Sequence, residues 1–260
     1  MSGILEYECL EYLEYEYLEF WNINVWNTKL MIKAILFDFN GVIIDDEPVQ
    51  LTAYREILKA DGIELTDDDY YACMGMDDLT FIRTNFARAG KEVTDERVAE
   101  INAAKTARWR ELIAGEVPMI RGAEHFIHLA SKDFALGIVS MAKREEIEFV
   151  LEKTGLLKWF SVIVSSEDIS RHKPDPECFL KGFGLIDSYR IKEGHLPMVH
   201  GETLVIEDAT QGVAAARAAG MKTLGITSAV SAEKLRAAGA DAVSSDLRDW
   251  MPESVRRVFV

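Results

Sequence analysis

Cysteine and proline are scarce in this chain of 260 residues, which holds three cysteines and six prolines. Cys9, Cys73 and Cys178 lie far apart and form no CxxC pair, a spacing that argues against a disulfide framework and against a zinc site. No run reaches the roughly 18 apolar residues that a membrane helix needs, and the N-terminus lacks the basic-then-apolar order of a secretory signal. The expected location is therefore the cytoplasm, with no membrane partner.

Basic residues are outnumbered: 29 Lys and Arg stand against 44 Asp and Glu, for a formal net charge of −15. This charge repels nucleic acid and anionic membranes, so neither is expected as a partner, and an anionic substrate needs a local cationic site. Hydrophobic residues make up 48% of the chain. The length and composition suit one large domain, or a core domain with a smaller inserted one.

Residues 1–30 differ in composition from the rest of the chain. The stretch from Glu6 to Phe20 repeats Glu, Tyr and Leu, with six Glu and no basic residue. Two interpretations are open: a helical arm that packs on a partner, or a leader outside the fold. We favour the leader, because a clean strand pattern begins at Met31. The sequence leaves the oligomeric state open.

From Met31 onward, short apolar runs alternate with amphipathic stretches of helical length, a pattern typical of a parallel sheet with crossover helices. The predicted strands cover residues 33–39, 134–140, 161–164, 203–206 and 222–226. The predicted helices between them cover 143–154, 176–182, 211–219 and 232–238, with Gly155 and Gly220 as C-caps. The strand runs are continuous and β-branched, as strands buried on both faces are. The expected fold class is α/β, a doubly wound parallel sheet.

One span interrupts this alternation. Residues 49–122 carry helical periodicity at 51–60, 79–89 and 95–113 without a strand pattern. A helical domain inserted between the first two core strands accounts for this span. The predicted domains are therefore a core of residues 31–48 and 123–260 and an inserted helical domain of residues 49–122.

Polar residues follow several of the predicted strands. Asp38 lies at the end of the first strand, Ser140 ends the second, Lys173 lies in the loop after the third, and Glu207 and Asp208 follow the fourth. In an open α/β sheet the ligand binds outside the carboxyl ends of the strands, so these side chains are expected at one edge. Taken singly, each has a plainer interpretation as a helix cap, a turn or a loop residue. As an ordered set on successive strands, they indicate a catalytic site.

The set matches the needs of phosphoryl transfer: a nucleophile in line with phosphorus, donors for the phosphoryl oxygens, and a hard cation. Asp38 is the candidate nucleophile, which would form an aspartyl-phosphate. Ser140 would donate a hydrogen bond to a phosphoryl oxygen. Lys173 would neutralise the phosphate and the crowded carboxylates, and would keep Asp38 ionised.

A magnesium ion is the expected cofactor. Mg²⁺ prefers an octahedral shell of carboxylate, carbonyl and water oxygens. Asp38, the backbone carbonyl of Asn40, and Asp208 can supply such oxygens. Glu207 would either bind the ion or support its ligands.

With these residues in place, the chain resembles the haloacid dehalogenase superfamily from Met31 to the C-terminus. Residues 37–48, FDFNGVIIDDEP, look like its first motif, and Ser140, Lys173 in Lys-Pro-Asp-Pro, and Glu207-Asp208 stand at the other three. The helical insert resembles the cap of the branch that includes phosphoglycolate phosphatase and β-phosphoglucomutase. The resemblance implies a magnesium-dependent phosphatase that acts on a small phosphorylated metabolite, either a sugar phosphate or a phosphoglycolate-like ester.

Asn40 departs from the family pattern, which places there a second Asp that protonates the leaving group and activates water. An amide does neither, and loss of a general acid/base costs about 10²- to 10⁴-fold in rate. Two origins fit this residue: a natural divergence, or a deliberate substitution that traps a complex or the phosphoenzyme. Asn40 motivates one alternative function, a catalytically impaired protein that binds phosphorylated metabolites. The other alternative is a phosphomutase like β-phosphoglucomutase, which shares the Glu207-Asp208 pair and the lysine at position 143.

Substrate contacts are expected from the cap and the hinge that leads to it. Lys143 lies three residues after Ser140, as a lysine does in β-phosphoglucomutase. The candidate substrate-binding residues are Gln50, Gly75, Met76, Asp78, Arg83 and Lys143.

Overall fold

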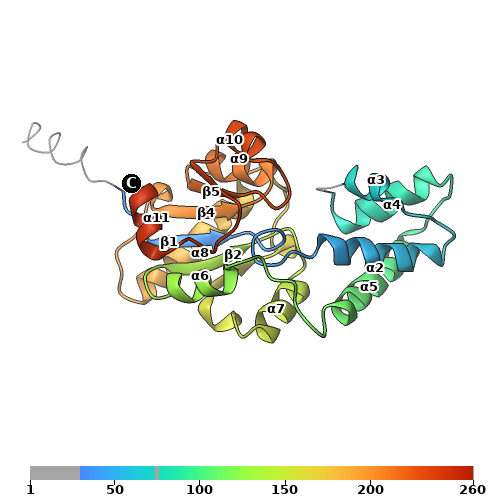
Figure 1. Cartoon of the computed structure of the whole chain (residues 1–260), viewed down its shortest axis with the longest axis horizontal. Coiled ribbons are helices and arrows are strands. Elements are labelled where there is room, and N and C mark those ends of the chain that lie inside the picture. The colour runs from blue at the N-terminus through green and yellow to red at the C-terminus, as the bar shows by residue number, and fades with distance from the viewer. Residues whose placement is uncertain (1–29, 74–75, 260) are drawn as a thin grey trace, which may run out of the picture. The chain divides into compact units, whose positions relative to one another are not determined.

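One parallel sheet runs through residues 30–73 and 76–259, which are the residues that the computed structural model describes. Its strand order is β3-β2-β1-β4-β5-β6, and every pair of neighbours is parallel; Figure 1 labels the four central strands. The strands are β1 (Ala34–Phe37), β2 (Ala135–Val139), β3 (Val162–Val164), β4 (Thr203–Glu207), β5 (Lys222–Ile226) and β6 (Ala242–Ser244). The predicted leader, apart from Leu30, lies outside the described residues, and so does Gly75.

The strands lie where the sequence has continuous apolar runs, because both faces of the sheet are covered. All four residues of β1 are buried: Ile35 and Phe37 pack into one hydrophobic cluster, and Ala34 and Leu36 pack into another. The prediction missed β6, whose residues Ala-Val-Ser are only half-buried and pair with β5 alone. A short, partly exposed strand carries no continuous hydrophobic signal.

Helices cover both faces of the sheet, which confirms the predicted doubly wound α/β fold. One cluster joins one face to α6 (Ala123–Ala130), α7 (Arg144–Lys153) and α11 (Pro252–Val258). The other cluster joins the second face to α8 (Glu177–Lys192) and α9 (Thr210–Ala218), and α10 (Ala232–Ala238) packs beside α9. Short 3₁₀ turns occur at Leu157–Trp159, Ser166–Asp168 and His200–Glu202.

The helix predicted at 176–182 is wrong in length, since α8 continues to Lys192. The prediction ended at Gly182, but this glycine packs against the sheet: a Cβ there would lie 2.6 Å from Val139 Cγ2. Gly182 is therefore a close-packing position inside the helix. The prediction also missed α6, α11 and the short α3 (Asp67–Tyr71).

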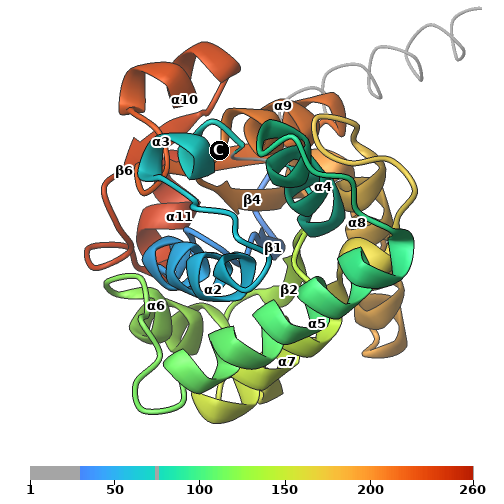
Figure 2. The same cartoon turned by 90° about the vertical axis from the view of Figure 1, so that its right-hand side faces the viewer.

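Helices α2 (Glu47–Lys59), α3, α4 (Asp78–Arg88) and α5 (Asp95–Leu112) lie between β1 and β2 in the chain. Figure 2 shows α2 alongside α5, and the two helices are in contact. These helices enclose a hydrophobic cluster of their own, which includes Leu58, Ile82, Phe86 and Ile101. We call residues 47–112 the helical segment; its treatment as a separate cap domain of residues 49–122 remains a prediction.

The register of the sheet sets where the functional candidates lie. Phe37, the last residue of β1, pairs with Ile138 of β2 and with Ile206 of β4. The residues that follow these three strands therefore emerge at the same edge. Among the described residues, no helix has both the length and the apolar character needed to cross a membrane.

Candidate active site

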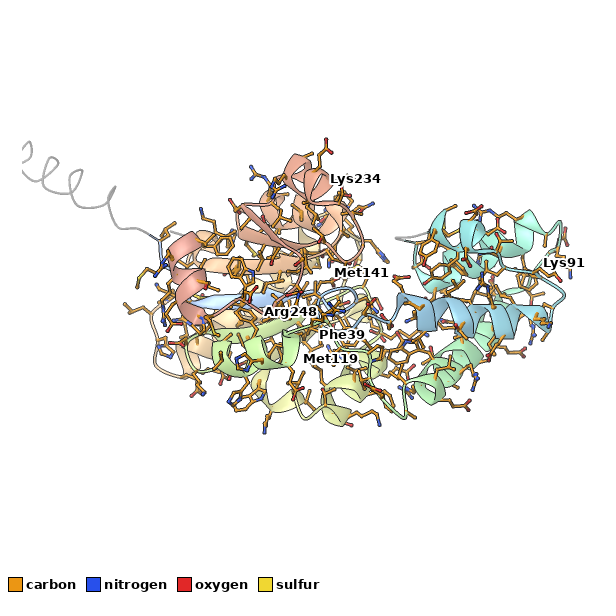
Figure 3. The ribbon with its side chains drawn as sticks, in the orientation of Figure 1. Phe39, Lys91, Met119, Met141, Lys234 and Arg248 are labelled. Atoms are coloured by element: carbon orange, nitrogen blue, oxygen red, sulfur yellow. The ribbon has the colours of Figure 1, made fainter. Side chains whose placement is uncertain are left out.

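Asp38 is the first residue beyond β1. Its backbone N–H donates to the carbonyl of Ile206 at 2.9 Å, which extends the strand ladder by one residue. The next side chain, Phe39, is fully buried in the main hydrophobic cluster, against which Met119 also packs (Figure 3). This packing anchors the loop and leaves the Asp38 side chain 12% exposed.

Lys173 lies between two carboxylates of different strands. Its ammonium donates to Asp38 Oδ1 at 3.0 Å and to Glu207 Oε1 at 2.5 Å, and its side chain is 8% exposed. Burial disfavours the charged ammonium, but Asp38 and Glu207 outweigh burial and hold the pKa of Lys173 above its usual value. The lysine therefore stays protonated and keeps both carboxylates paired.

Glu207 and Asp208 complete a cluster of three carboxylates. Oxygens of Asp38, Glu207 and Asp208 lie within 4.8 Å of one another. Two backbone groups hold the Glu207 carboxylate in place: its Oε2 accepts hydrogen bonds from the N–H groups of Asp208 (3.0 Å) and Ala209 (3.1 Å). It also lies over Gly212, where a Cβ would come within 1.9 Å of the carboxylate.

Burial and mutual repulsion perturb this cluster. Burial raises the pKa of Glu207, against the lowering effect of Lys173. Burial, and then the charges of Glu207 and Asp38, raise the pKa of Asp208 well above its usual value. One ammonium thus faces three carboxylates, which leaves an excess of negative charge.

Ser228 contacts Asp208 and the backbone of Gly41, and the sequence did not predict these contacts. Its hydroxyl lies 3.2 Å from Asp208 Oδ2 and donates to the carbonyl of Gly41 at 2.5 Å. Gly41 has a φ of +71°, and a Cβ at this position would lie 1.8 Å from Asp208 Oδ2. Gly41 therefore serves both the turn after β1 and the position of the Asp208 carboxylate.

A Gly41→Ala variant is expected to raise the Mg²⁺ concentration needed for half-maximal phosphate release by about tenfold or more, because the new methyl group displaces the Asp208 carboxylate. The backbone cost of a positive φ is about 1–2 kcal/mol. Gly90→Ala is the matched control, since Gly90 has a φ of +67° and open space at its Cβ; its neighbour Lys91 is labelled in the helical segment in Figure 3. The measurement is the Mg²⁺ concentration that gives half-maximal phosphate release, with the thermal midpoint beside it. Equal Mg²⁺ dependence in the two variants would contradict the role of Gly41.

Ser140 is buried at the end of β2, and its N–H donates to Val164 O at 3.0 Å. Its hydroxyl accepts the backbone N–H of Ala142 at 3.1 Å. It does not cap α7, whose N-cap is Lys143 with no side-chain cap. The plainer interpretation of Ser140 as a cap of that helix therefore fails, and its donor role toward a phosphoryl oxygen remains a prediction.

Asn40 is held by the carboxylate of Asp46, the residue before α2. Asn40 Nδ2 donates to Asp46 Oδ1 at 2.8 Å. Gln50 Nε2 and Trp109 Nε1 each donate to Asp46 Oδ2, also at 2.8 Å. Burial raises the pKa of Asp46 to about 6, against the effect of these hydrogen bonds. Sequence reasoning did not identify this network, although Asp46 lies in the first motif.

The predicted substrate-binding residues are dispersed. Gln50 belongs to the Asp46 network, while Met76 is 43% exposed. Arg83 forms an exposed ion pair with Asp95 at 2.6 Å. These contacts do not bring Arg83 to the carboxylate cluster, so its substrate role stays a prediction.

Asp78 and Lys143 are half-buried and belong to a charged group that also includes the buried Lys105 and Glu146. The Lys105 ammonium lies 3.1 Å from Asp78 and 3.5 Å from Glu146. Burial opposes the charge of Asp78, but Lys105 holds the pKa of this carboxyl below its usual value.

The Lys143 ammonium is also engaged. It donates to Asn102 Oδ1 at 2.8 Å and to Thr106 Oγ1 at 2.9 Å, both on α5, and lies 3.7 Å from Asp78. Asp78 and Lys143 thus link the helical segment to the start of α7.

The donor set at the strand edge suits a magnesium ion. Carboxylate oxygens are the hard ligands that Mg²⁺ prefers, and three of them converge from Asp38, Glu207 and Asp208. The unbalanced negative charge of this cluster adds to the fit. The proposed ligation by the Asn40 carbonyl remains a prediction.

Comparisons with known proteins agree on one family. Residues 35–226 match the family model described as haloacid dehalogenase-like hydrolase. A validoxylamine A 7'-phosphate phosphatase of Streptomyces hygroscopicus subsp. limoneus is 28% identical over 220 residues, covering 84% of this chain and 96% of the relative. A phosphorylated carbohydrates phosphatase of Thermotoga maritima is 28% identical over 194 residues, covering 74% and 84%. The crystal structure of a β-phosphoglucomutase from Clostridium difficile has the same fold, with a TM-score of 0.73 at 21% identity, covering 88% of this chain and 97% of that one.

Proposed function

Because the chain belongs to the haloacid dehalogenase-like hydrolase family, we propose that it is a magnesium-dependent phosphatase that acts on a small phosphorylated metabolite through an aspartyl-phosphate. The observation that carries the proposal is the Asp38 carboxylate, held by Lys173 at 3.0 Å beside the carboxylates of Glu207 and Asp208. The predicted phosphoric monoester hydrolase agrees with the names of the relatives. On the resemblance to the family, the expected substrates are sugar phosphates and phosphoglycolate-like esters.

The roles of the side chains follow from their contacts. An Asp38 oxygen attacks phosphorus, and Lys173, which donates a hydrogen bond to this carboxylate, offsets charge on the phosphoryl group. Ser140 is buried at the neighbouring strand end and would donate to a phosphoryl oxygen. Mg²⁺, when bound by Asp38, Glu207 and Asp208, supplies the positive charge that this crowded site lacks.

A phosphomutase is the second candidate. It would need a cation for a second phosphate, and Lys143 is the residue that matches β-phosphoglucomutase. The Lys143 ammonium, however, already bonds to Asn102 and Thr106 and lies 3.7 Å from Asp78. The phosphatase is therefore better supported.

Phosphate release from a panel of small phosphate compounds tests the proposal. We expect release in the presence of Mg²⁺ and its loss when EDTA removes the metal. Conversion of one phosphate isomer to another without net release would favour the mutase. Binding of phosphate compounds without any turnover would favour the catalytically impaired binding protein.

The thermal midpoint gives a readout that is independent of turnover. The folded-state pKa values of Glu207 and Asp208 are raised, so these groups destabilise the metal-free fold as the pH rises through their folded-state pKa values. Mg²⁺ offsets their charge, and stabilisation is about 2.7 kcal/mol at 100 times the dissociation constant. We therefore expect Mg²⁺ to raise the midpoint more at pH 8 than at pH 5. Asp208→Asn should shrink this difference, and a midpoint that ignores Mg²⁺ at both pH values would count against the metal site.

A further inference from the structure

The residue two positions after Asp38 is Asn40, and its side-chain amide already makes a hydrogen bond within the protein. Asn40 Nδ2 donates to Asp46 Oδ1 at 2.8 Å. An ionised carboxylate only accepts hydrogen bonds, so the NH₂ group of Asn40 faces Asp46 and its oxygen faces away. A carboxamide has no proton to transfer at neutral pH. Asn40 therefore cannot serve as the acid for a departing oxygen.

The neighbouring carboxylate does not replace it. Asp46 is 1% exposed, and both of its oxygens accept hydrogen bonds from protein side chains. One of these donors is the indole N–H of Trp109, a group that donates only, so the Asp46 oxygen that it contacts is fixed as an acceptor. The carboxylate of Asp46 is thus buried and engaged by Asn40, Gln50 and Trp109.

Lys173 does not supply a proton either. Its ammonium pairs with Asp38 and Glu207 inside the carboxylate cluster. Transfer of its proton to a leaving group would leave these two buried carboxylates without their cationic partner, which is unfavourable. None of Asn40, Asp46 and Lys173 is thus free to give a proton to the leaving group.

We infer that the site acts on phosphates whose leaving group departs as a weakly basic anion, namely acyl, enol or aryl phosphates. This inference rests on the aspartyl-phosphate mechanism of the proposed function and changes its substrate class, because sugar phosphates and phosphoglycolate-like esters are then no longer the preferred substrates. It also ranks simple alkyl esters, including phosphates of ordinary sugar hydroxyls, as slow substrates.

The first step balances without an acid for such substrates. An Asp38 oxygen bonds to phosphorus while the bond from phosphorus to the leaving oxygen breaks, and the electron pair leaves with that oxygen. A carboxylate leaving group has a pKa near 4 and a phenolate near 10, so each departs as a stable anion. An alkoxide, comparable in basicity to hydroxide with water at about 15.7, needs a proton as it leaves. In the second step water bonds to phosphorus, the bond to Asp38 breaks, and both protons of the water end on inorganic phosphate.

The size of the preference follows from the missing acid. General acid catalysis contributes about 10²- to 10⁴-fold for a leaving group that needs a proton, and little for one that does not. The test compares kcat/KM for acetyl phosphate, phenyl phosphate and glycerol phosphate with the unaltered chain and Mg²⁺, because kcat/KM reports the steps up to departure of the leaving group. We expect acetyl phosphate to exceed glycerol phosphate by at least about 100-fold, with phenyl phosphate between them.

A pair of substitutions can transfer the carboxylate from position 46 to position 40. Asn40→Asp/Asp46→Ser places an acid at position 40 and removes the like charge 2.8 Å away. The ratio of kcat/KM for acetyl phosphate to kcat/KM for glycerol phosphate, which we call the gap, should therefore fall by about 10²-fold or more. Asn40→Asp alone should narrow it less, because two carboxylates then face each other. Asp46→Ser alone should leave the gap wide; a selective loss of glycerol phosphate turnover in this variant would identify Asp46 as the acid and overturn the inference.

The outcomes for the unaltered chain separate the inference from the proposed function. A kcat/KM for glycerol phosphate within about 100-fold of that for acetyl phosphate would overturn the inference and leave the proposed phosphatase intact. Failure to hydrolyse any of the three compounds would overturn the proposed function, and the inference with it. Because these outcomes need only the unaltered chain, poor folding of a variant does not protect the inference.

Discussion

Asp38→Asn is expected to abolish phosphate release, with a loss on the order of 10⁶-fold, the scale for removal of a covalent nucleophile. The amide keeps the size of the side chain and still accepts a hydrogen bond from Lys173, which lies 3.0 Å from Asp38 Oδ1. It also removes one of three clustered negative charges. The fold should therefore be retained, with a thermal midpoint at or above that of the unaltered chain in the absence of metal.

Asp45→Asn is the matched control, since Asp45 is an exposed carboxylate in the same loop. We expect its phosphate release to stay within about twofold, as surface substitutions change little. A second measurement follows the phosphoryl group itself: substrate labelled with radioactive phosphate should label the protein at Asp38. Activity of Asp38→Asn within tenfold of the unaltered chain, or label on a different residue, would remove Asp38 as the nucleophile.

Lys173→Met is expected to lower both turnover and stability. Loss of one preorganised donor to developing charge costs about 10²- to 10³-fold in kcat. Removing one partner of a buried ion pair costs about 3–5 kcal/mol, and the ammonium of Lys173 pairs with both Asp38 and Glu207. The folded-state pKa of Glu207, already raised by burial, should rise further without this partner. The loss of stability should therefore be larger at pH 8 than at pH 5, where protons take the place of the ammonium.

Thermal or denaturant unfolding without metal, at these two pH values, measures the effect. Lys181→Met is the control: Lys181 lies in α8, just after the loop that holds Lys173, and pairs on the surface with Asp168, with a side chain that is 41% exposed. A surface pair of this kind is worth about 0–1 kcal/mol. Equal losses for Lys173→Met and Lys181→Met would contradict the structural account of the buried pair.

The sequence predicted most of the sheet because burial on both faces leaves a pattern that is local in the chain. Residues such as Ile35 and Phe37 alternate with Ala34 and Leu36 between two hydrophobic clusters, so every position of β1 is apolar. The missed strand β6 lies at the edge and is only half-buried, and its composition resembles that of a loop. The length of α8 was missed because Gly182 suggested a stop, whereas the structure uses it for contact with Val139.

The same distinction between local pattern and tertiary contact separates the site residues that were predicted from those that were missed. Asp38, Lys173, Glu207 and Asp208 were selected because each is tied to the end of a strand pattern. Ser228 was not, because its partner Gly41 lies 187 residues away and no local pattern records that pairing. Trp109 contacts Asp46 across 63 residues of sequence, and only the packing of α5 brings them together. Contacts of this kind depend on tertiary structure.

The buried ammonium of Lys105 limits how this protein can exchange parts with its relatives. Lys105 is on α5, and its carboxylate partners are Asp78 at the start of α4 and Glu146 on α7. A chimera that receives a foreign helical segment in place of residues 47–112 would keep Glu146 and lose its cation. Such a chimera would carry an uncompensated buried carboxylate, at about 3–5 kcal/mol. Grafts designed to change substrate preference therefore need to carry α7 along with the helical segment, or to change Glu146 at the same time.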